Sequence, residues 1–297
     1  MNENNIVLGV DIGGSHITCA QIDLQKEQII AGTKISSPVN SKGSKEEIID
    51  VWVRIIKESF TNKVKPSLIG VAMPGPFDYD AGICLMRGVG KYDSIYGLDV
   101  KKLFAEAAGI KMGNVKFLND ASCFALGEFY AGAGKGLNRM IGITLGTGFG
   151  SSLIVDGKIV DEGAGVPEGG MFWNVPYKDG IADDYFSTRW FEGEYYKKSG
   201  VRKKGVYEIA NNIETDDNAR KLFDEFSKNL TEFLFPWIER FKPDVVVTGG
   251  GISKSHYLFL PSLQRELFKK GIKTEIRISE LWEDAALIGS GNLFKSN

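Results

Sequence analysis

The first thirty residues alternate apolar runs with glycine-rich breaks, a pattern that predicts short strands joined by tight turns. Ile6 to Val10 and Ile17 to Ile22 are the apolar runs, and Gly13 and Gly14 separate them. Residues 139 to 161 repeat this order, with the turn GTGFG between two apolar runs and then an Asp-Gly pair typical of a two-residue hairpin. Because one supersecondary unit opens each half of the chain, we predict two related lobes.

Helical periodicity accounts for much of the remaining sequence. Ser44 to Phe60 has capping-box spacing and one apolar face, which predicts an amphipathic helix that covers a sheet. The longest predicted helix is Asp217 to Phe241, which Pro236 should kink. Further helices are expected at residues 99–108, 121–130, 256–270 and 283–294, and further strands at residues 68–73, 115–118 and 245–247. Strands that alternate with covering helices, plus two antiparallel hairpins, predict an α/β fold with mixed sheets flanked by helices.

Composition limits the kinds of partner. The 297 residues are 43% apolar and 25% charged, which is typical of a water-soluble globular protein with room for two domains. A formal net charge of -2 provides no positive field for a nucleic-acid partner. The N-terminus lacks a secretory pattern and no apolar run approaches the roughly 20 residues of a membrane span, so we expect a cytoplasmic protein without a membrane partner. The cysteines, Cys19, Cys84 and Cys123, form no C-x-x-C pair and are expected to be reduced and mostly buried.

Three glycine-rich turns each follow a predicted strand, at residues 11–15, 145–150 and 247–251. Glycine lets backbone N–H groups approach phosphate oxygens closely, although any one of these turns alone is more commonly a tight hairpin. No turn has the G-x-x-x-x-G-K-[ST] pattern of a Walker loop, and Ser151 stands where a dinucleotide fingerprint needs glycine. What remains is a nucleotide bound between two hairpin turns, with the third turn available for the nucleoside.

Two polar positions, Asp11 and the pair Asn119-Asp120, each have a structural and a functional interpretation. Asp11 precedes the first turn and could bind Mg²⁺ directly or through water, or simply end a strand. Asn119 and Asp120 begin a predicted helix, where either would serve as an ordinary N-cap. The functional alternative makes Asp120 a general base for a substrate hydroxyl and Asn119 a hydrogen-bond partner of a sugar.

Five segments, DIGGS, GVAMPGP, FLNDA, LGTGFG and VVVTGGG, occur in this order across nearly the whole chain. Together they resemble the ROK family of sugar kinases and repressors, within the actin-like ATPase superfamily. The resemblance implies two actin-like (ribonuclease H-like) lobes with a cleft between them. Residues 1–118 with the helix 283–297 would form the first lobe and residues 119–282 the second.

The resemblance also implies an activity, the ATP- and Mg²⁺-dependent phosphorylation of a hydroxyl of a free hexose by a homodimer. Glucose is the first expectation, with an N-acetylhexosamine or fructose behind it. The ATP-binding residues implied are Gly13, Gly14, Ser15, Thr147, Gly148, Gly249, Gly250 and Gly251. The sugar-binding residues implied are Gly75, Asn119, Asp120, Glu168 and Asp183, with Asp120 as the catalytic base.

One departure from the family pattern affects the sugar pocket. Met171 stands where the family has a histidine, and no cysteine lies between residues 171 and 187. A thioether replaces imidazole neither as a zinc ligand nor as a donor to a sugar hydroxyl, so we predict no zinc site and an altered pocket. Phe172 or Trp173 could fill that pocket, although aromatic residues are more often simply part of the core. His16 and His256 are interpreted as ordinary strand and helix residues outside the catalytic set.

Three other classes of protein share parts of this pattern. A sugar-responsive repressor would need an added DNA-binding segment, for which we expect no room before the first strand at Asn5 or Ile6. A sugar-binding relative without catalysis is favoured by Met171 and opposed by Asp120 and the three glycine turns. An actin- or chaperone-type ATPase fits less well, because the PGP and NDA segments suit a small hydroxyl acceptor.

Overall fold

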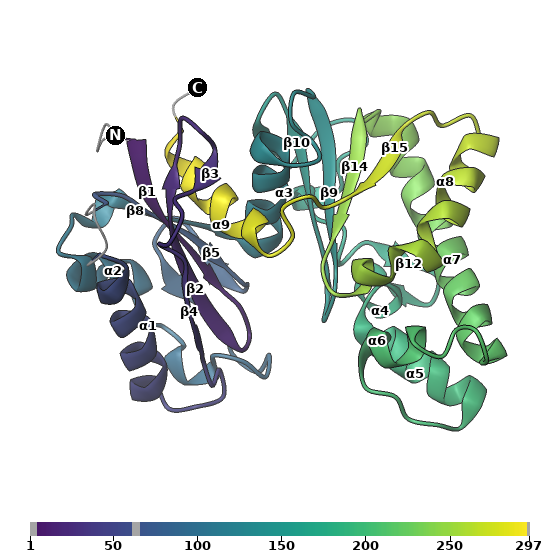
Figure 1. The fold of residues 1–297 in the computed structure, drawn as a ribbon, viewed down its shortest axis with the longest axis horizontal. Helices are drawn as coiled ribbons and strands as arrows, with labels where there is room; N and C mark the ends of the chain where they lie inside the picture. The colour runs from purple at the N-terminus through teal and green to yellow at the C-terminus, as the bar shows by residue number, and fades with distance from the viewer. Residues whose placement is uncertain (1–4, 61–65, 296–297) are drawn as a thin grey trace. The chain divides into compact units, whose positions relative to one another are not determined.

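The computed structural model describes residues 5–60 and 66–295, and the chain divides into two compact units. The first unit comprises residues 1–131 and 283–297, and the second comprises residues 132–282. Figure 1 colours the chain from its N-terminus in purple to its C-terminus in yellow. The first unit extends past the boundary of 118 expected from the sequence, because helix α3 (Asp120–Ala131) stays with it.

The first unit is built on a mixed sheet with strand order β3-β2-β1-β5-β8, and β4 also pairs with β2. β1 pairs antiparallel with β2, so that Ile12 lies opposite Ile17 at the hairpin end, and β1, β5 and β8 run parallel. The strands are β1 (Ile6–Ile12), β2 (His16–Asp23), β3 (Gln28–Ile29), β4 (Ile35–Pro38), β5 (Ile69–Met73) and β8 (Val115–Asn119). A short pair, β6 (Phe77–Asp78) and β7 (Ile83–Cys84), lies outside this sheet.

Helices cover both faces of this sheet. α1 (Lys45–Ser59) begins with the predicted capping box at Ser44, and α2 (Val100–Ala108) ends at Gly109 in the left-handed conformation. Their apolar faces enclose a core that contains Trp52 and Phe104, whose rings meet edge to face at 5.8 Å. The α1 and α2 segments therefore form as their periodicity predicts.

The opposite face carries α9 (Asp284–Gly291), which packs against β1 and β5 and in Figure 1 is the yellow helix beside them. A side chain at Gly70 of β5 would collide with the backbone of Ser290, so glycine at this position permits the close approach. Gly289 of α9 likewise lies against the carbonyl of Cys123 in α3. This close helix pair attaches α3 to the first unit, and the prediction of strand and helix patterns alone could not reveal it.

The second unit repeats the sheet logic of the first, with strand order β11-β10-β9-β14-β15. β9 pairs antiparallel with β10 and parallel with β14, as β1 does with β2 and β5. The strands are β9 (Arg139–Leu145), β10 (Phe149–Val155), β11 (Lys158–Val160), β14 (Val245–Gly249) and β15 (Glu275–Ile278), with a separate pair β12 (Pro176–Tyr177) and β13 (Gly180–Ile181). The predicted α/β fold with mixed sheets is confirmed.

Helices and buried aromatic rings fill the rest of the second unit. The helices are α4 (Ala182–Tyr185), α5 (Thr188–Ser199), α6 (Gly205–Ala210), α7 (Asp217–Phe241) and α8 (Leu260–Lys269). α7 continues through Pro236, and the helix expected at 256–270 is instead a 3₁₀ segment, η5 (Ile252–Leu258), followed by α8. Pro261 at the start of α8 explains the break, because proline suits the first turn of a helix and not its interior.

The other short 3₁₀ segments are η2 (Asp93–Ile95), η3 (Met112–Asn114), η4 (Glu168–Gly170) and η6 (Asn292–Phe294). Cys19, Cys84 and Cys123 are buried and unbridged, so the predicted burial is confirmed. Within residues 5–60 and 66–295, no helix combines the length and apolarity that crossing a bilayer requires.

Candidate functional site

The first glycine turn joins β1 to β2 and is held by three hydrogen bonds. The Gly13 N–H donates to the His16 carbonyl at 2.9 Å, and the Val39 N–H donates to the Ser15 carbonyl at 2.8 Å. The hydroxyl of Tyr92 donates to the Gly13 carbonyl at 2.6 Å. Tyr92 is fully buried, and burial raises the pKa of its hydroxyl, so it remains a proton donor at any ordinary pH. The sequence did not indicate this residue, which lies 79 positions from Gly13.

The N–H groups at the tip of this turn have no partner within the described part of the chain. Gly14 and Ser15 are exposed, and neither N–H donates a hydrogen bond to any described residue. A Cβ at Gly14 would meet no atom within 4 Å, and its φ is not left-handed, so the fold itself does not require glycine there. Exposed N–H donors beside an absent side chain are what close approach of a phosphate needs.

Asp11 and His16 flank the turn on the two paired strands. Asp11 Oδ2 lies 3.8 Å from His16 Nε2, and this carboxylate raises the pKa of His16. Asp11 keeps about one fifth of its side-chain surface exposed, so it can still reach a cation or a water. His16 is the first residue of β2, as the sequence predicted, although its charge depends on Asp11.

The second glycine turn joins β9 to β10 and is bound from one side by the segment at the start of α5. Thr188 donates to the Gly146 carbonyl through its N–H at 2.8 Å and through Oγ1 at 2.9 Å. Arg189 Nη1 donates to the Thr147 carbonyl at 2.9 Å. The N–H groups of Thr147 and Gly148 donate to no residue among those described, so this turn resembles the first in presenting unpaired donors.

Asp183 lies directly behind the same turn. Its Oδ1 accepts from the Phe149 N–H at 2.6 Å, and its Oδ2 pairs with Arg189 Nη2 at 2.6 Å. Both carboxylate oxygens therefore have protein partners. Asp183 was expected among the sugar ligands, and the structure places it at the second glycine turn; Arg189 was not expected at all.

The third glycine turn lies beside the second within the same unit. Gly250 has a φ of 86°, and a Cβ there would lie 2.5 Å from the Leu145 carbonyl oxygen at the end of β9, so the fold requires glycine at this position. A Cβ at Gly251, by contrast, would meet no atom within 4 Å. The backbone nitrogen of Gly251 lies 4.0 Å from the point that a Cβ on Gly146 would occupy. The structure thus places the third turn against Leu145 and Gly146, the two residues that directly precede Thr147 and Gly148 in the chain.

Asn119 and Asp120 stand at the start of α3, where the sequence allowed either of them to be the helix N-cap. Asn119 Oδ1 accepts from the Ala121 N–H at 3.0 Å and from the Ser122 N–H at 3.4 Å, so Asn119 is the N-cap of α3. Asp120 Oδ1 accepts from the Ala121 N–H at 2.9 Å, and among the described residues no side chain donates a hydrogen bond to either Asp120 oxygen. The cap is therefore satisfied without Asp120, whose carboxylate keeps an available oxygen.

The electrostatic surroundings of Asp120 favour its protonated form. Burial raises the pKa of Asp120 most, the positive charge of Lys91 lowers it, and the negative charge of Asp11 raises it again. The net direction is upward, which suits a general base that must accept a proton near neutral pH. Lys91 was not indicated by the sequence.

Tyr79 connects Asn119 to the loop that contains Gly75. Asn119 Nδ2 donates to the Tyr79 hydroxyl at 3.2 Å, and this hydroxyl donates to the Met73 carbonyl at 3.1 Å. A Cβ at Gly75 would lie 3.3 Å from the same hydroxyl oxygen. Gly75, Asn119 and Asp120 therefore lie together in the first unit, with Tyr79 as a further polar group beside them.

Glu168, Phe172 and Trp173 differ in how far they are exposed. Glu168 begins η4, is exposed, and lines a pocket of about 620 Å³ with Asp161 and Glu162. Phe172 is fully buried, with its ring stacked on Phe149 at 6.3 Å, so of the two interpretations of this residue the structure favours the core position. Its packing in the aromatic core explains why an aromatic residue stands there. Trp173 is 45% exposed and stays available for contact.

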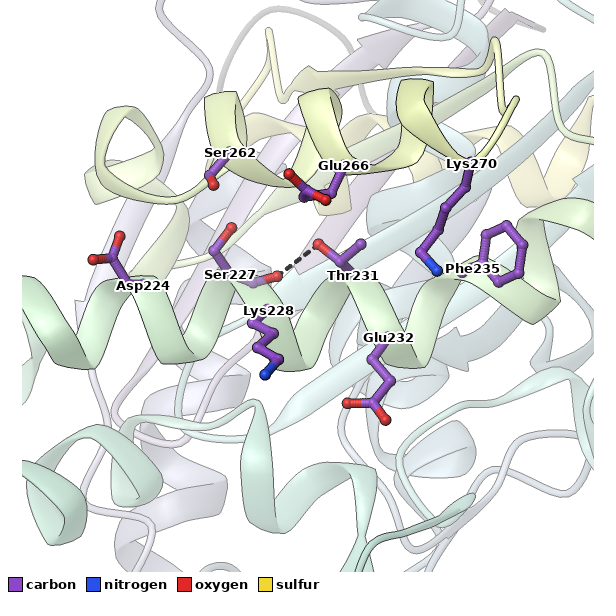
Figure 2. Close-up of a pocket in the computed structure, with 9 residues that line it drawn as sticks. All are labelled: Asp224, Ser227, Lys228, Thr231, Glu232, Phe235, Ser262, Glu266 and Lys270. Atoms are coloured by element: carbon purple, nitrogen blue, oxygen red, sulfur yellow. Dashed lines mark hydrogen bonds between the residues drawn. The ribbon is translucent and has the colours of Figure 1, made fainter.

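A separate pocket of about 700 Å³ lies between α7 and α8 (Figure 2). Its polar residues have local roles, since Ser227 and Thr231 donate to backbone carbonyls and Lys270 covers the Phe235 ring at 4.7 Å. None of the residues expected to bind ATP or sugar lines it.

Comparison with known proteins identifies the family. The ROK family profile matches residues 7–297. A glucokinase of Thermotoga maritima is 27% identical over 97% of each chain, and an N-acetyl-D-glucosamine kinase of Vibrio atlanticus is 28% identical over 84% of this chain and 86% of that protein. A ROK hexokinase of Thermus thermophilus superposes with a TM-score of 0.80 at 21% identity over 96% of each chain. A ROK glucokinase of Streptomyces griseus, solved with glucose and AMPPNP, gives 0.75 at 20% identity over 97% of this chain and 98% of that one. With the family profile spanning nearly its whole length, this chain belongs to the ROK family.

Proposed function

We propose that the protein is an ATP-dependent kinase that phosphorylates a hydroxyl of a free hexose or N-acetylhexosamine. The observation that carries the proposal is Asp120, a carboxylate with a raised pKa and an oxygen left available because Asn119 already caps the helix. The helix cap requires neither a raised pKa nor an available carboxylate oxygen at Asp120. Family membership and the kinase relatives support the same reaction.

The proposed chemistry assigns each described group one task. Asp120 accepts the proton of the sugar hydroxyl as the hydroxyl oxygen bonds to the γ-phosphorus and the bond from that phosphorus to the departing ADP breaks. Asn119 and the Gly75 loop orient the sugar. The unpaired N–H groups of the first and second glycine turns bind phosphate oxygens and stabilise charge on the transferring group. In the second unit, exposed Glu168 is available to accept hydrogen bonds from sugar hydroxyls.

ATP is expected to arrive with Mg²⁺, which prefers hard oxygen ligands and keeps several waters. The partly exposed carboxylate of Asp11, next to the first glycine turn, is suited to bind the ion directly or through water. When bound, the ion would neutralise charge on the phosphates. His16 near Asp11 would have to stay neutral or turn away, because an imidazolium would compete for the same carboxylate.

Glucose is the first substrate to test, since a glucokinase is among the relatives at 27% identity. N-acetylglucosamine follows with nearly the same support, from a kinase relative at 28% identity. Fructose is a further candidate. Met171, which is 37% exposed, replaces a polar donor with a thioether and should alter the pocket on its side.

The test is ADP release from MgATP across a panel of hexoses, N-acetylhexosamines and ketoses, with Asp120→Asn as the control enzyme. Turnover on a sugar by the wild type, with loss in the control, would support the proposal and name the substrate. Sugar binding without turnover would instead identify a non-catalytic sugar-binding member of the family. Equal turnover by Asp120→Asn would refute the assignment of the base.

We also propose that the protein is a cytoplasmic homodimer. The buried, unbridged cysteines are consistent with a reducing compartment. Light scattering of the purified protein tests the dimer, since a mass equal to one 32.7 kDa chain would refute it. Fractionation of the source cells tests the location.

A further inference from the structure

Side chains at the start of α5 donate hydrogen bonds to two carbonyls of the second glycine turn, and Asp183 accepts one from the Phe149 N–H that follows the turn. We term the residues that make these bonds the clamp: Asp183, Thr188 and Arg189. Thr188 Oγ1 donates to the Gly146 carbonyl, and Arg189 Nη1 donates to the Thr147 carbonyl. The Gly146 and Thr147 carbonyls and the Phe149 N–H thus each have a partner in the clamp.

Because the peptide group is planar, these contacts with the carbonyls also fix the direction of the N–H groups of Thr147 and Gly148. In a trans peptide the C=O of one residue and the N–H of the next point in opposite directions within one plane. Binding the carbonyls of Gly146 and Thr147 therefore directs the N–H groups of Thr147 and Gly148 away from the clamp. Neither of these two N–H groups donates a hydrogen bond to a residue that the structure describes.

The clamp is internally connected by charge. Arg189 Nη2 and Asp183 Oδ2 are 2.6 Å apart, so the same guanidinium binds the turn and the carboxylate that binds Phe149. The planar fork of arginine suits two acceptors at once, which a lysine ammonium does less well. Because the Arg189 side chain is 59% exposed and that of Asp183 is 21% exposed, the pair should add little to global stability.

We propose that Asp183 and Arg189 are positioning residues for the nucleotide, which fix the turn so that the N–H groups of Thr147 and Gly148 face its phosphates. The identity of the ligand rests on the proposed kinase function. The consequence is specific: each oxygen of Asp183 already accepts a hydrogen bond that holds the clamp and the turn, so we assign Asp183 to ATP binding and not to sugar binding.

The test measures affinities separately for AMPPNP with Mg²⁺ and for glucose and N-acetylglucosamine, by calorimetry on the full chain. The variants are Arg189→Ala, Arg189→Lys and Asp183→Asn. Lys197→Ala is the matched control, since it removes an exposed 2.7 Å ion pair with Glu194 on the same helix. Melting temperatures confirm that each variant is folded.

Arg189→Ala should weaken AMPPNP binding by about tenfold, the effect of one charge-assisted hydrogen bond, while Lys197→Ala has no effect. Arg189→Lys should recover part of the loss, Asp183→Asn should weaken AMPPNP binding, and sugar affinity should stay unchanged throughout. Unchanged AMPPNP binding in Arg189→Ala would overturn the proposal. So would an Asp183→Asn variant that loses sugar affinity alone, which would make Asp183 a sugar ligand.

The outcomes separate the two proposals. If the wild type binds AMPPNP with the predicted variant pattern but phosphorylates no sugar, the kinase assignment fails and the clamp stands. If it phosphorylates a sugar and Arg189→Ala binds AMPPNP normally, the clamp fails and the kinase assignment stands.

Discussion

Replacing Tyr92 by phenylalanine removes one of the three hydrogen bonds that hold the first glycine turn, the one donated by a side chain. The Tyr92 hydroxyl donates to the Gly13 carbonyl at 2.6 Å, and its ring lies 5.3 Å from that of Trp52. Phenylalanine keeps the ring and nearly all of its volume, so neither a cavity nor a collision should arise. The change therefore removes one donor from a buried position and little else.

The expected magnitude follows from the exposure of the acceptor. A typical intramolecular hydrogen bond contributes about 1 kcal/mol net, and a buried acceptor left without a partner costs about 1–3 kcal/mol. Gly13 is partly exposed, so water can reach its carbonyl and the loss should stay near the lower value. We expect the free energy of unfolding to fall by about 1 kcal/mol.

Nucleotide affinity should fall as well. With the Gly13 carbonyl released, the following peptide can rotate, and binding must then supply the ordering that Tyr92 provided. A cost of about 1 kcal/mol corresponds to roughly fivefold weaker AMPPNP binding. Urea unfolding and calorimetry measure the two effects, and Tyr96→Phe is the control because Tyr96 is 52% exposed on the same segment. Unchanged AMPPNP affinity in a Tyr92→Phe variant that has lost stability would refute the positioning role.

Further predictions concern the base and the glycines. Asp120→Asn should lower kcat by about 10²- to 10⁴-fold with little change in AMPPNP affinity, as measured by ADP release. Because the folded-state pKa of Asp120 is raised, the folded protein binds more protons than the unfolded chain between the two pKa values. The free energy of unfolding of the wild type should therefore fall as pH rises through that interval. Above the interval, urea unfolding should find Asp120→Asn more stable than the wild type. The kcat of the wild type should fall when the pH is lowered through the raised pKa of Asp120. Gly14→Ala should change the free energy of unfolding by less than about 0.5 kcal/mol and yet weaken AMPPNP binding, whereas Gly250→Ala, with a φ of 86° and its Cβ against Leu145, should destabilise the fold itself.

Local patterns predicted the elements that depend on local causes. The strand–turn–strand repeat appears in the structure as the hairpins β1–β2 and β9–β10, because alternation and turn residues act over a few positions. The capping box at Ser44 likewise forms as its sequence spacing predicts. The break before α8 could have been predicted from Pro261, since proline favours a helix start.

The supports of the site depend on contacts that no local pattern contains. Tyr92 reaches Gly13 across 79 positions, and Arg189 reaches Thr147 across 42. The attachment of α3 to the first unit depends on the close packing of Gly289, which in the sequence is one glycine among 36. The choice between a core and a pocket position for Phe172 has the same origin, because only the packed structure shows its ring against Phe149.

The two glycine turns share their geometry but not the chemistry of their supports. In each turn a side chain binds the carbonyl that precedes an unpaired N–H: Tyr92 for Gly14, and Arg189 for Gly148. Tyr92 is buried and neutral, so its effect should be insensitive to salt, whereas Arg189 is 59% exposed and charged. Since mobile ions screen exposed charges over about 8 Å at physiological ionic strength, the affinity lost in Arg189→Ala should shrink as salt is added, while that lost in Tyr92→Phe should not. Equal salt dependence of the two losses would mean that Arg189 acts through its shape and not through its charge.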